Sequence, residues 1–229
     1  MKTSISQDKL VDYVHAQLNA FFPDGYGVNR DVLVRGSSDA LLRLEQCFLK
    51  VSVKKYFDGS HALFDHLYSD QYLIFLWFLS NSLWRRGVDQ NTLNKVYLLN
   101  KCLHGFDCAY DTALPDVFIV IHGVGTVLGK AQYSDYFTVY QGCTVGQTQG
   151  RYPRLGRGVG LGAGASIIGD CPMGDFASIG AGCTLVNFRV ENNSSIIRDP
   201  TGALVVREGT PAAISRQYFL EDHLFKPAA

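Results

Sequence analysis

His122 is the residue in this sequence best suited to chemistry. It lies in the run IHGVG at positions 121–125, within a glycine-rich stretch. An imidazole exchanges a proton near neutral pH, so it can take the proton of a hydroxyl that attacks a carbonyl carbon. A carboxylate on the other ring nitrogen would fix the tautomer and stabilise the charged ring. Asp107, Asp111 and Asp116 lie upstream as candidate partners. Without further context, a histidine of this kind is more often a packing residue.

The remaining histidines have no comparable surroundings. His104 is expected on the helical side of the chain, and the others are expected to be surface or packing residues: His15, His61, His66 and His223. Only His122 lies in the glycine-rich region, whereas a zinc enzyme of the carbonic anhydrase type needs about three histidine ligands. The sequence therefore argues against a metal site.

The composition argues against several classes of partner. The 229 residues include 21 Lys and Arg and 21 Asp and Glu, so bulk charge favours neither nucleic acid nor a membrane surface. The chain does not open like a secretory signal, and its longest apolar stretch, Tyr72–Leu79, is too short to span a bilayer. The six cysteines form no CxxC pair. We expect a cytoplasmic protein with free thiols.

Residues 1–106 have the periodicity of helices. Apolar residues repeat at helical spacing in Ser6–Phe22, and Pro-Asp-Gly follows as a turn. Helices are also expected over Leu41–Val53, Ser69–Trp84 and Leu93–Leu103. Such a helical domain could pack on itself, cap the second half of the chain or build an oligomer interface.

Residues 107–190 follow a six-residue repeat instead. One ladder of apolar residues consists of Leu155, Leu161, Ile167, Met173, Ile179 and Leu185, and an upstream ladder consists of Ile121, Val127, Tyr133, Val139 and Val145. Each hexad predicts a short strand with the ladder residue inside and a corner with a small residue. Three hexads make a triangular coil of roughly 18 residues, typical of a solenoid. An antiparallel sandwich fits less well, because its strands alternate with period two. The two ladders are four positions out of phase, so Gly146–Arg154 is expected to bulge as a loop.

Three runs within this region also match a known family. They are IHGVGTVLG from position 121, YQGCTVG from position 140 and YPRLGRGVGLGAGA from position 152. Residues 105–190 resemble the serine acetyltransferase branch of the hexapeptide-repeat acyltransferases, and the helical half resembles the family only in general character. The resemblance implies an α-helical domain followed by a left-handed parallel β-helix. It also implies transfer of an acetyl group from acetyl-CoA to a hydroxyl.

The resemblance implies a set of site residues as well. The family uses a catalytic histidine and an aspartate fifteen residues upstream, which selects Asp107 as the partner of His122. Backbone amides in the family's glycine-rich coils contact the thioester and the pantetheine arm, and the matching positions here are Gly146, Ala163 and Ala181. Family members bind coenzyme A between neighbouring β-helices. A homotrimer or a dimer of trimers, without a metal, is therefore expected.

The acceptor side of the site departs from the family's pattern. The residue before the catalytic histidine is usually an aspartate that holds an ammonium group, and here it is Ile121. An arginine and a histidine usually precede the proline of the loop, where this chain has Arg151 and Tyr152. Arg151 could hold a carboxylate, and Tyr152 could stack on a ring. We expect a small-molecule O-acetyltransferase acting on serine or, alternatively, on a sugar of surface-polysaccharide biosynthesis. A non-catalytic β-helix scaffold is the third alternative.

Residues 191–229 leave the repeat. Ser194–Ile197 and Ala203–Val206 flank Asp-Pro-Thr-Gly, which predicts a hairpin. A short closing helix is expected within Ala212–Phe225. Either element would cover the free strand edge at the end of the solenoid.

Overall fold

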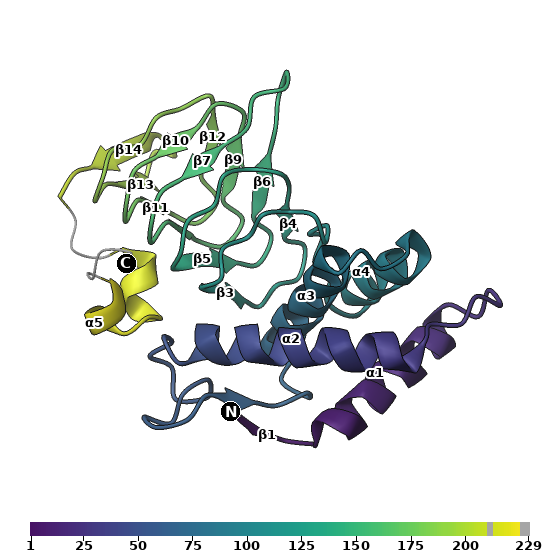
Figure 1. Ribbon diagram of the computed structural model, residues 1–229. Coiled ribbons are helices and arrows are strands. Elements are labelled where there is room, and N and C mark those ends of the chain that lie inside the picture. Colours follow the sequence, from purple (N-terminus) through teal and green to yellow (C-terminus); the bar gives the residue numbers. More distant parts are fainter. Residues whose placement is uncertain (210–212, 225–229) are drawn as a thin grey trace.

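The chain folds into a helical half and a β-helix that lie against each other (Figure 1). The structure, a computed structural model, describes residues 1–209 and 213–224. Four long helices come first, and short strands wound into a solenoid follow them. No helix within the described residues is both long and apolar enough to cross a bilayer.

Capping side chains define the beginnings of three of the four long helices. The helices are α1 (Gln7–Phe21), α2 (Arg30–Phe48), α3 (Ser69–Arg85) and α4 (Gln90–His104). Ser6, Asn29 and Asp89 each accept a backbone N–H of the first turn, which would otherwise lack a partner. Two short strands, β1 (Lys2–Thr3) and β2 (Leu63–Phe64), pair in parallel within the same half.

The predicted bounds of α2 are wrong, whereas those of the other three helices agree to within three residues. The sequence predicts this helix over Leu41–Val53, but it begins at Arg30 and ends at Phe48. Gly36 interrupts the helical pattern in the sequence because glycine is a poor helix former. In the fold it allows close packing, since a Cβ at this position would lie 2.5 Å from Leu83 Cδ2 of α3.

The strands of the β-helix form three sheets, one for each face of a triangular coil. The first sheet contains β3 (Phe118–Ile121), β5 (Phe137–Tyr140), β8 (Gly160–Leu161), β11 (Ser178–Ile179), β13 (Ser195–Arg198) and β14 (Leu204–Arg207). The second contains β4 (Val127–Leu128), β6 (Thr144–Gly146), β9 (Ser166–Ile168) and β12 (Thr184–Val186), and the third contains β7 (Arg154–Leu155) and β10 (Pro172–Met173). All neighbours pair in parallel except β13 and β14. Leu161 pairs with Ile179, 18 positions on, which is the predicted coil length.

The downstream ladder is confirmed, and the upstream ladder is partly wrong. Every residue of the downstream ladder is buried. In the first coil, however, Val127 is 40% exposed, and the buried positions are Val120 and Leu128. Eight positions separate Val120 from Leu128, against six between their partners in the next coil, Val139 and Val145. The corner between β3 and β4 therefore holds two extra residues, which shift the phase of the repeat.

The loop predicted over Gly146–Arg154 is confirmed. β6 ends at Gly146 and β7 begins at Arg154. Between them Thr148 and Arg151 form an antiparallel bridge, so the insertion is a small hairpin. It projects from the corner between the second and third sheets, called the second corner.

Helix α3 covers the open end of the first coil. Phe118 lies on the same strand face as Val120, so its ring points into the coil. There it contacts Trp77 and Phe78, with ring centroids 5.4 Å away in both cases. One continuous core of buried apolar residues extends from the helices into the β-helix.

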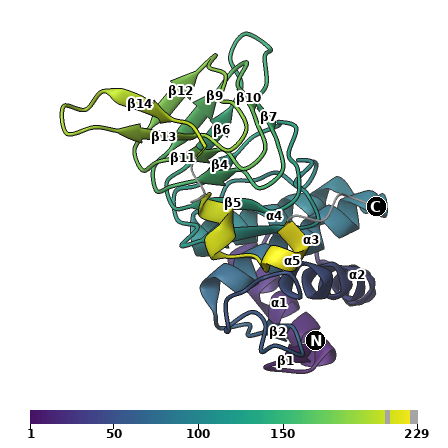
Figure 2. The ribbon, with the colours of Figure 1, turned by 90° about the vertical axis from the view of Figure 1, so that its left-hand side faces the viewer.

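The predicted hairpin is confirmed, but the remainder of the tail does not close the far end of the solenoid. β13 and β14 pair antiparallel and end the first sheet. A 3₁₀ helix (Ile214–Gln217) and α5 (Glu221–Leu224) follow, whereas Ala212 and Phe225 lie outside the described residues. Ser215 Oγ donates to the carbonyl of Gly158, and Phe219 forms a bridge with Val51. The tail therefore crosses the first sheet beside β5 and joins it to the helical half (Figure 2).

Candidate active site

His122 lies directly after β3, in the lengthened corner of the first coil. This corner joins the first and second sheets and is called the first corner. Its φ is 52°, a left-handed conformation that a non-glycine residue seldom adopts. The neighbouring Gly123 lies against α3, since a Cβ there would be 2.4 Å from Leu73 Cδ1. The imidazole itself is 73% exposed. The corner thus presses its backbone against the helical half and turns the histidine ring outward.

The carboxylate beside His122 belongs to Asp70, in the first turn of α3. Asp70 Oδ2 accepts the backbone N–H of His122 at 3.1 Å and lies 3.9 Å from the ring nitrogen Nδ1. The Asp70 side chain is only 6% exposed. The sequence analysis did not identify this residue, which lies 52 positions before the histidine.

Asp107, the expected partner, makes no hydrogen bond or ion pair with His122. Its Oδ1 accepts from the Tyr97 hydroxyl at 2.5 Å, and its Oδ2 accepts from Lys101 Nζ at 2.7 Å. Burial alone would raise the pKa of Asp107, but the contacts with Lys101 and Tyr97 outweigh it and hold that pKa below its ordinary value. The structure therefore brings Asp70, and not Asp107, to the imidazole.

The two other upstream carboxylates are also engaged elsewhere. Asp111 pairs with Lys130 at 3.0 Å, and Asp116 pairs with Arg43 at 3.3 Å.

Two of the three positions expected to contact coenzyme A fall at the same corner as His122. Ala181 lies beside Ala163 and Ala163 beside Gln141 on successive coils. The column continues to Val124, whose carbonyl accepts the N–H of Gly142, and His122 and Gly123 are the two extra residues just before it. Within the described residues, the backbone N–H groups of Ala163 and Ala181 have no hydrogen-bond partner. Gln141 Oε1 is buried there without a partner as well. The corner therefore combines this corner column of four residues, with its unused polar groups, and the exposed imidazole of the insertion beside it.

Gly146, Arg151 and Tyr152 lie at the second corner instead. Gly146 ends β6, and the hairpin loop that follows carries the other two. Tyr152 is 43% exposed, and the Arg151 guanidinium makes no ion pair with any described residue. Both line a shallow pocket of about 440 Å³ together with Gln132 and other neighbours. Within one chain the second sheet thus separates these residues from His122.

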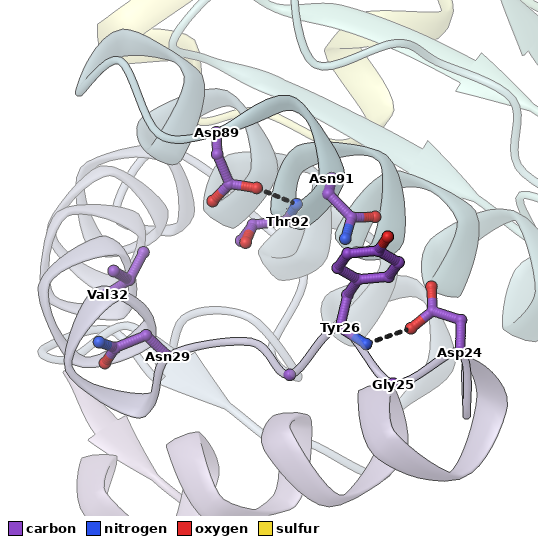
Figure 3. A pocket seen from close by; sticks show the side chains of 9 residues that line it. Asp24, Gly25, Tyr26, Asn29, Val32, Asp89, Asn91 and Thr92 are labelled. Carbon is purple, nitrogen blue, oxygen red and sulfur yellow. Dashed lines mark hydrogen bonds between the residues drawn. The ribbon is translucent and has the colours of Figure 1, made fainter.

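A cavity of about 710 Å³ lies in the helical half, between the α1–α2 connection and the start of α4 (Figure 3). Its polar groups bond to one another: Asp89 accepts the N–H of Thr92, and Asp24 accepts the N–H of Tyr26. Buried Lys95 also donates to Asp24 at 2.6 Å. The lining includes none of the expected site residues, so His122 remains the centre of the candidate site.

Comparison with known proteins agrees with the fold and with the motifs. No family model matches the chain. The serine acetyltransferase of Synechococcus elongatus is 32% identical over 116 residues, which make up 48% of this chain and 47% of that protein. The chain resembles the serine acetyltransferases. It spans about half the length of this serine acetyltransferase relative. The putative colanic acid biosynthesis acetyltransferase WcaB of Escherichia coli is 26% identical over 139 residues, 55% of this chain and 83% of that protein.

Solved serine acetyltransferase structures share the architecture. The Neisseria gonorrhoeae enzyme has a TM-score of 0.66 at 20% identity, covering 92% of this chain and 83% of that chain. The Brucella abortus serine acetyltransferase in complex with coenzyme A has a TM-score of 0.63 at 19% identity, covering 90% of this chain and 84% of that chain. The fold is therefore the expected helical domain followed by a left-handed parallel β-helix.

Proposed function

We propose that this protein is an O-acetyltransferase that moves an acetyl group from acetyl-CoA to a hydroxyl of a small molecule. One observation carries the proposal: an exposed imidazole, His122, lies at the same corner of the coil as backbone N–H groups that have no partner among the described residues. Acyl transfer to a hydroxyl needs a base and donors for a developing oxyanion. Similarity to serine acetyltransferases and to WcaB supports the same chemistry.

In this proposal His122 is the general base. A ring nitrogen accepts the proton of the acceptor hydroxyl while the hydroxyl oxygen bonds to the thioester carbonyl carbon. The carbonyl oxygen gains negative charge, which the backbone N–H donors stabilise. When the carbon–sulfur bond breaks, the imidazolium returns the proton to the departing sulfur. The products are an acetyl ester and the free thiol of coenzyme A, and the histidine is regenerated.

The corner column suits the pantetheine arm of coenzyme A. Ala181 is exposed and Ala163 is half-buried, so a ligand can approach the backbone at both positions. Gln141 belongs to the same column, and its amide oxygen is buried without a partner among the described residues. It is an acceptor that a pantetheine N–H could satisfy if the side chain turned outward. A structural relative, the Brucella abortus serine acetyltransferase, has been solved with coenzyme A.

We infer that the complete site forms between two copies of the chain, as a homotrimer or a dimer of trimers. Within one copy, Gly146, Arg151 and Tyr152 lie at a different corner from His122. A threefold arrangement of triangular coils can bring the second corner of one copy to the first corner of the next. Light scattering at micromolar concentration should give a trimer or a hexamer, and a monomer would contradict this arrangement.

The acceptor is the less specified substrate. Ile121 cannot pair with an ammonium group, so selectivity for serine should be weak. Arg151 is exposed and lines the pocket of the loop, so it could hold a carboxylate of the acceptor. A sugar hydroxyl is the second candidate, favoured by the exposed ring of Tyr152 and by similarity to WcaB.

The test is release of free thiol from acetyl-CoA in the presence of serine, homoserine, amino sugars and neutral sugars. Acceptor-dependent release is the expected result, and the acceptor with the highest kcat/KM identifies the substrate class. Silence across the panel, together with no binding of coenzyme A by calorimetry, would instead favour a non-catalytic scaffold.

A further inference from the structure

We propose that Asp70 is the positioning residue of His122, holding its backbone and its ring at once from the helical half of the molecule. The inference rests on the proposed function, and it names a residue that the family's fifteen-residue spacing does not select. One carboxylate oxygen lies 3.1 Å from the His122 backbone nitrogen and 3.9 Å from Nδ1.

The backbone contact accounts for the conformation of the corner. A non-glycine residue at φ 52° is strained, and the surrounding structure must hold it there. The N–H of His122 is fixed by a carboxylate that is itself 94% buried. Leu73, on the same helix as Asp70, lies against the next residue, Gly123. Helix α3 thus sets the direction in which the histidine leaves the chain.

The charge of Asp70 has one titratable partner. Among the described residues no lysine or arginine pairs with this carboxylate, and His122 is the only group in ion-pair range. A buried carboxylate without a cation is unfavourable, and the positive end of the α3 dipole at its first turn offsets only part of this cost. The carboxylate becomes better compensated when the imidazole takes up a proton, which is the moment of hydroxyl attack. An interaction that strengthens in the transition state raises kcat, whereas equal binding of ground and transition states does not.

The geometry also assigns the two ring nitrogens. Nδ1 faces Asp70, so a proton on Nδ1 points toward the carboxylate. Nε2 is then unprotonated and free to accept the hydroxyl proton. Catalytic contacts of this kind are often long before substrate binds, so 3.9 Å suits a pair that tightens in the complex. Asp107 already accepts from Lys101 and Tyr97, so both of its oxygens have donors without His122.

A different role for Asp70 would be direct contact with an ammonium group of the acceptor. It would replace the carboxylate that the family carries where this chain has Ile121. The two roles separate kinetically: a positioning residue affects kcat for every acceptor, whereas an ammonium partner affects KM for acceptors that carry an amine.

The test compares Asp70→Asn with the wild type, with His122→Ala and with the double variant. Asparagine keeps an oxygen for the backbone N–H and removes the charge. We expect kcat to fall on the order of 100-fold for all acceptors, with KM values changed by less than about 2-fold. In the His122→Ala background the same substitution should change the residual rate by less than about 2-fold, since Asp70 acts through the ring. Asp70→Glu, which retains the charge, should recover part of the rate.

Asp65→Asn is the matched control. Asp65 also accepts a backbone N–H, from Leu67 at 3.0 Å, and lies 3.7 Å from a histidine ring, that of His66. It should leave kcat within about 2-fold of wild type. Equal losses from Asp70→Asn in the presence and absence of His122, or an increase in KM confined to amine-bearing acceptors, would overturn the positioning role.

A second readout does not depend on activity. In protein labelled with ¹⁵N-histidine, the His122 signals, identified by their loss in His122→Ala, should report a proton on Nδ1 in the wild type. In Asp70→Asn the population should shift toward the other tautomer. An unchanged tautomer would overturn the inference even if no acceptor is found. Thiol release by the wild type with no effect of Asp70→Asn would overturn it while leaving the proposed function intact.

Discussion

The helical half and the β-helix fill their cores with different residues. The helices bury large rings such as Trp77 and Phe75, together with polar groups such as Asn81 and Lys95. The β-helix stacks aliphatic side chains of the same position from coil to coil, as in the pair Leu161–Ile179. In the repeat, the location of a residue follows from its phase. In the helices, each contact is made once and follows from no pattern.

This difference explains where the candidate site lies. Departures from the repeat coincide with the candidate site residues: two extra residues at the corner of His122, and the four-residue shift that makes the loop of Arg151. The helical half contributes unique contacts instead: it meets the β-helix at the corner of His122 through Asp70, and inside the first coil through Phe118. The candidate site therefore combines the regular coils of the β-helix with an irregular contact from helix α3.

The largest effect should come from removing the base at the lengthened corner. His122→Ala should lower kcat by roughly 10²–10⁴-fold, the usual contribution of general-base catalysis. The side chain is 73% exposed, so stability and coenzyme A affinity should remain close to wild type. Thiol-release kinetics and calorimetry measure the two quantities. Unchanged turnover would end the assignment of His122 as the base.

Among these variants, the largest loss of stability should come from a substitution at the junction of the two halves. Phe118 is fully buried against Trp77 and Phe78, so Phe118→Ala should lower the free energy of unfolding by about 3–5 kcal/mol. The two tryptophans both lie in α3, so their fluorescence reports the helical half, while circular dichroism reports the whole chain.

If one core joins the halves, the two signals should change at the same denaturant concentration. Phe188→Ala is the control, because this ring is 39% exposed on the β-helix, and it should change stability by less than about 1 kcal/mol. Separate transitions in the wild type would show that the halves fold independently, contrary to the continuous core.

The sequence predicts most of the repeat and less of the helical half. The reason is that contacts in the repeat follow from a residue's phase, whereas contacts in the helical half do not. Hexad phase predicted the strands and the loop, whereas Ala163 and Ala181, which lie side by side in the structure, were selected by the family resemblance. Hexad phase failed only where extra residues changed the phase, at Ile121 and Val127. Asp70 was missed because an acidic residue in the first turn of a helix is ordinary in isolation.

The course of the tail was also beyond prediction. A hairpin signature is local, so β13 and β14 could be identified from four turn residues. The crossing of the first sheet depends on contacts with distant segments, such as Phe219 with Val51. No periodic pattern encodes such a contact.

A paired glycine substitution would sharpen the contrast between the two cores. At Gly162 a Cβ would lie 2.9 Å from Ala181 N and 3.1 Å from Ile179 O, backbone atoms of the next coil. Coils hydrogen-bonded on both sides cannot separate locally, so Gly162→Ala should cost about 1–3 kcal/mol. At Gly36 the obstacles are side-chain atoms, Leu83 Cδ2 at 2.5 Å, Leu83 Cγ at 2.9 Å and Leu79 Cδ1 at 3.0 Å, which can shift more than a hydrogen-bonded backbone. Alanine also gains about 1 kcal/mol of helix propensity there.

Gly36→Ala should therefore cost less than Gly162→Ala in urea denaturation of the two variants. The opposite order would mean that the coils adjust more readily than the packed helices, and that the repeat is the softer of the two cores.

The smallest effect concerns pH and the end of α4. Burial lowers the pKa of His104 to about 4, and the hydrogen bond to Asn100 only partly opposes this. As the pH falls below the unfolded value of 6.5, the unfolded chain takes up a proton that the folded chain does not. The stability from neutral His104 is thus complete above pH 6.5 and is lost progressively toward pH 4.

Because His104 is partly exposed, we expect a loss of about 1 kcal/mol between pH 6.5 and 5, below the limit of about 1.4 kcal/mol per pH unit. His104→Gln retains an amide for Asn100 but does not titrate, so the free energy of unfolding should vary less over this interval. His61→Gln, at a histidine 53% exposed, should keep the wild-type dependence. If the free energy of unfolding of His104→Gln varied with pH as steeply as that of the wild type, the pH dependence would have to come from a residue outside α4. In that case the protonation of His104 would not affect stability. The polar core of the helical half would then differ from the core of the β-helix only in its hydrogen bonds.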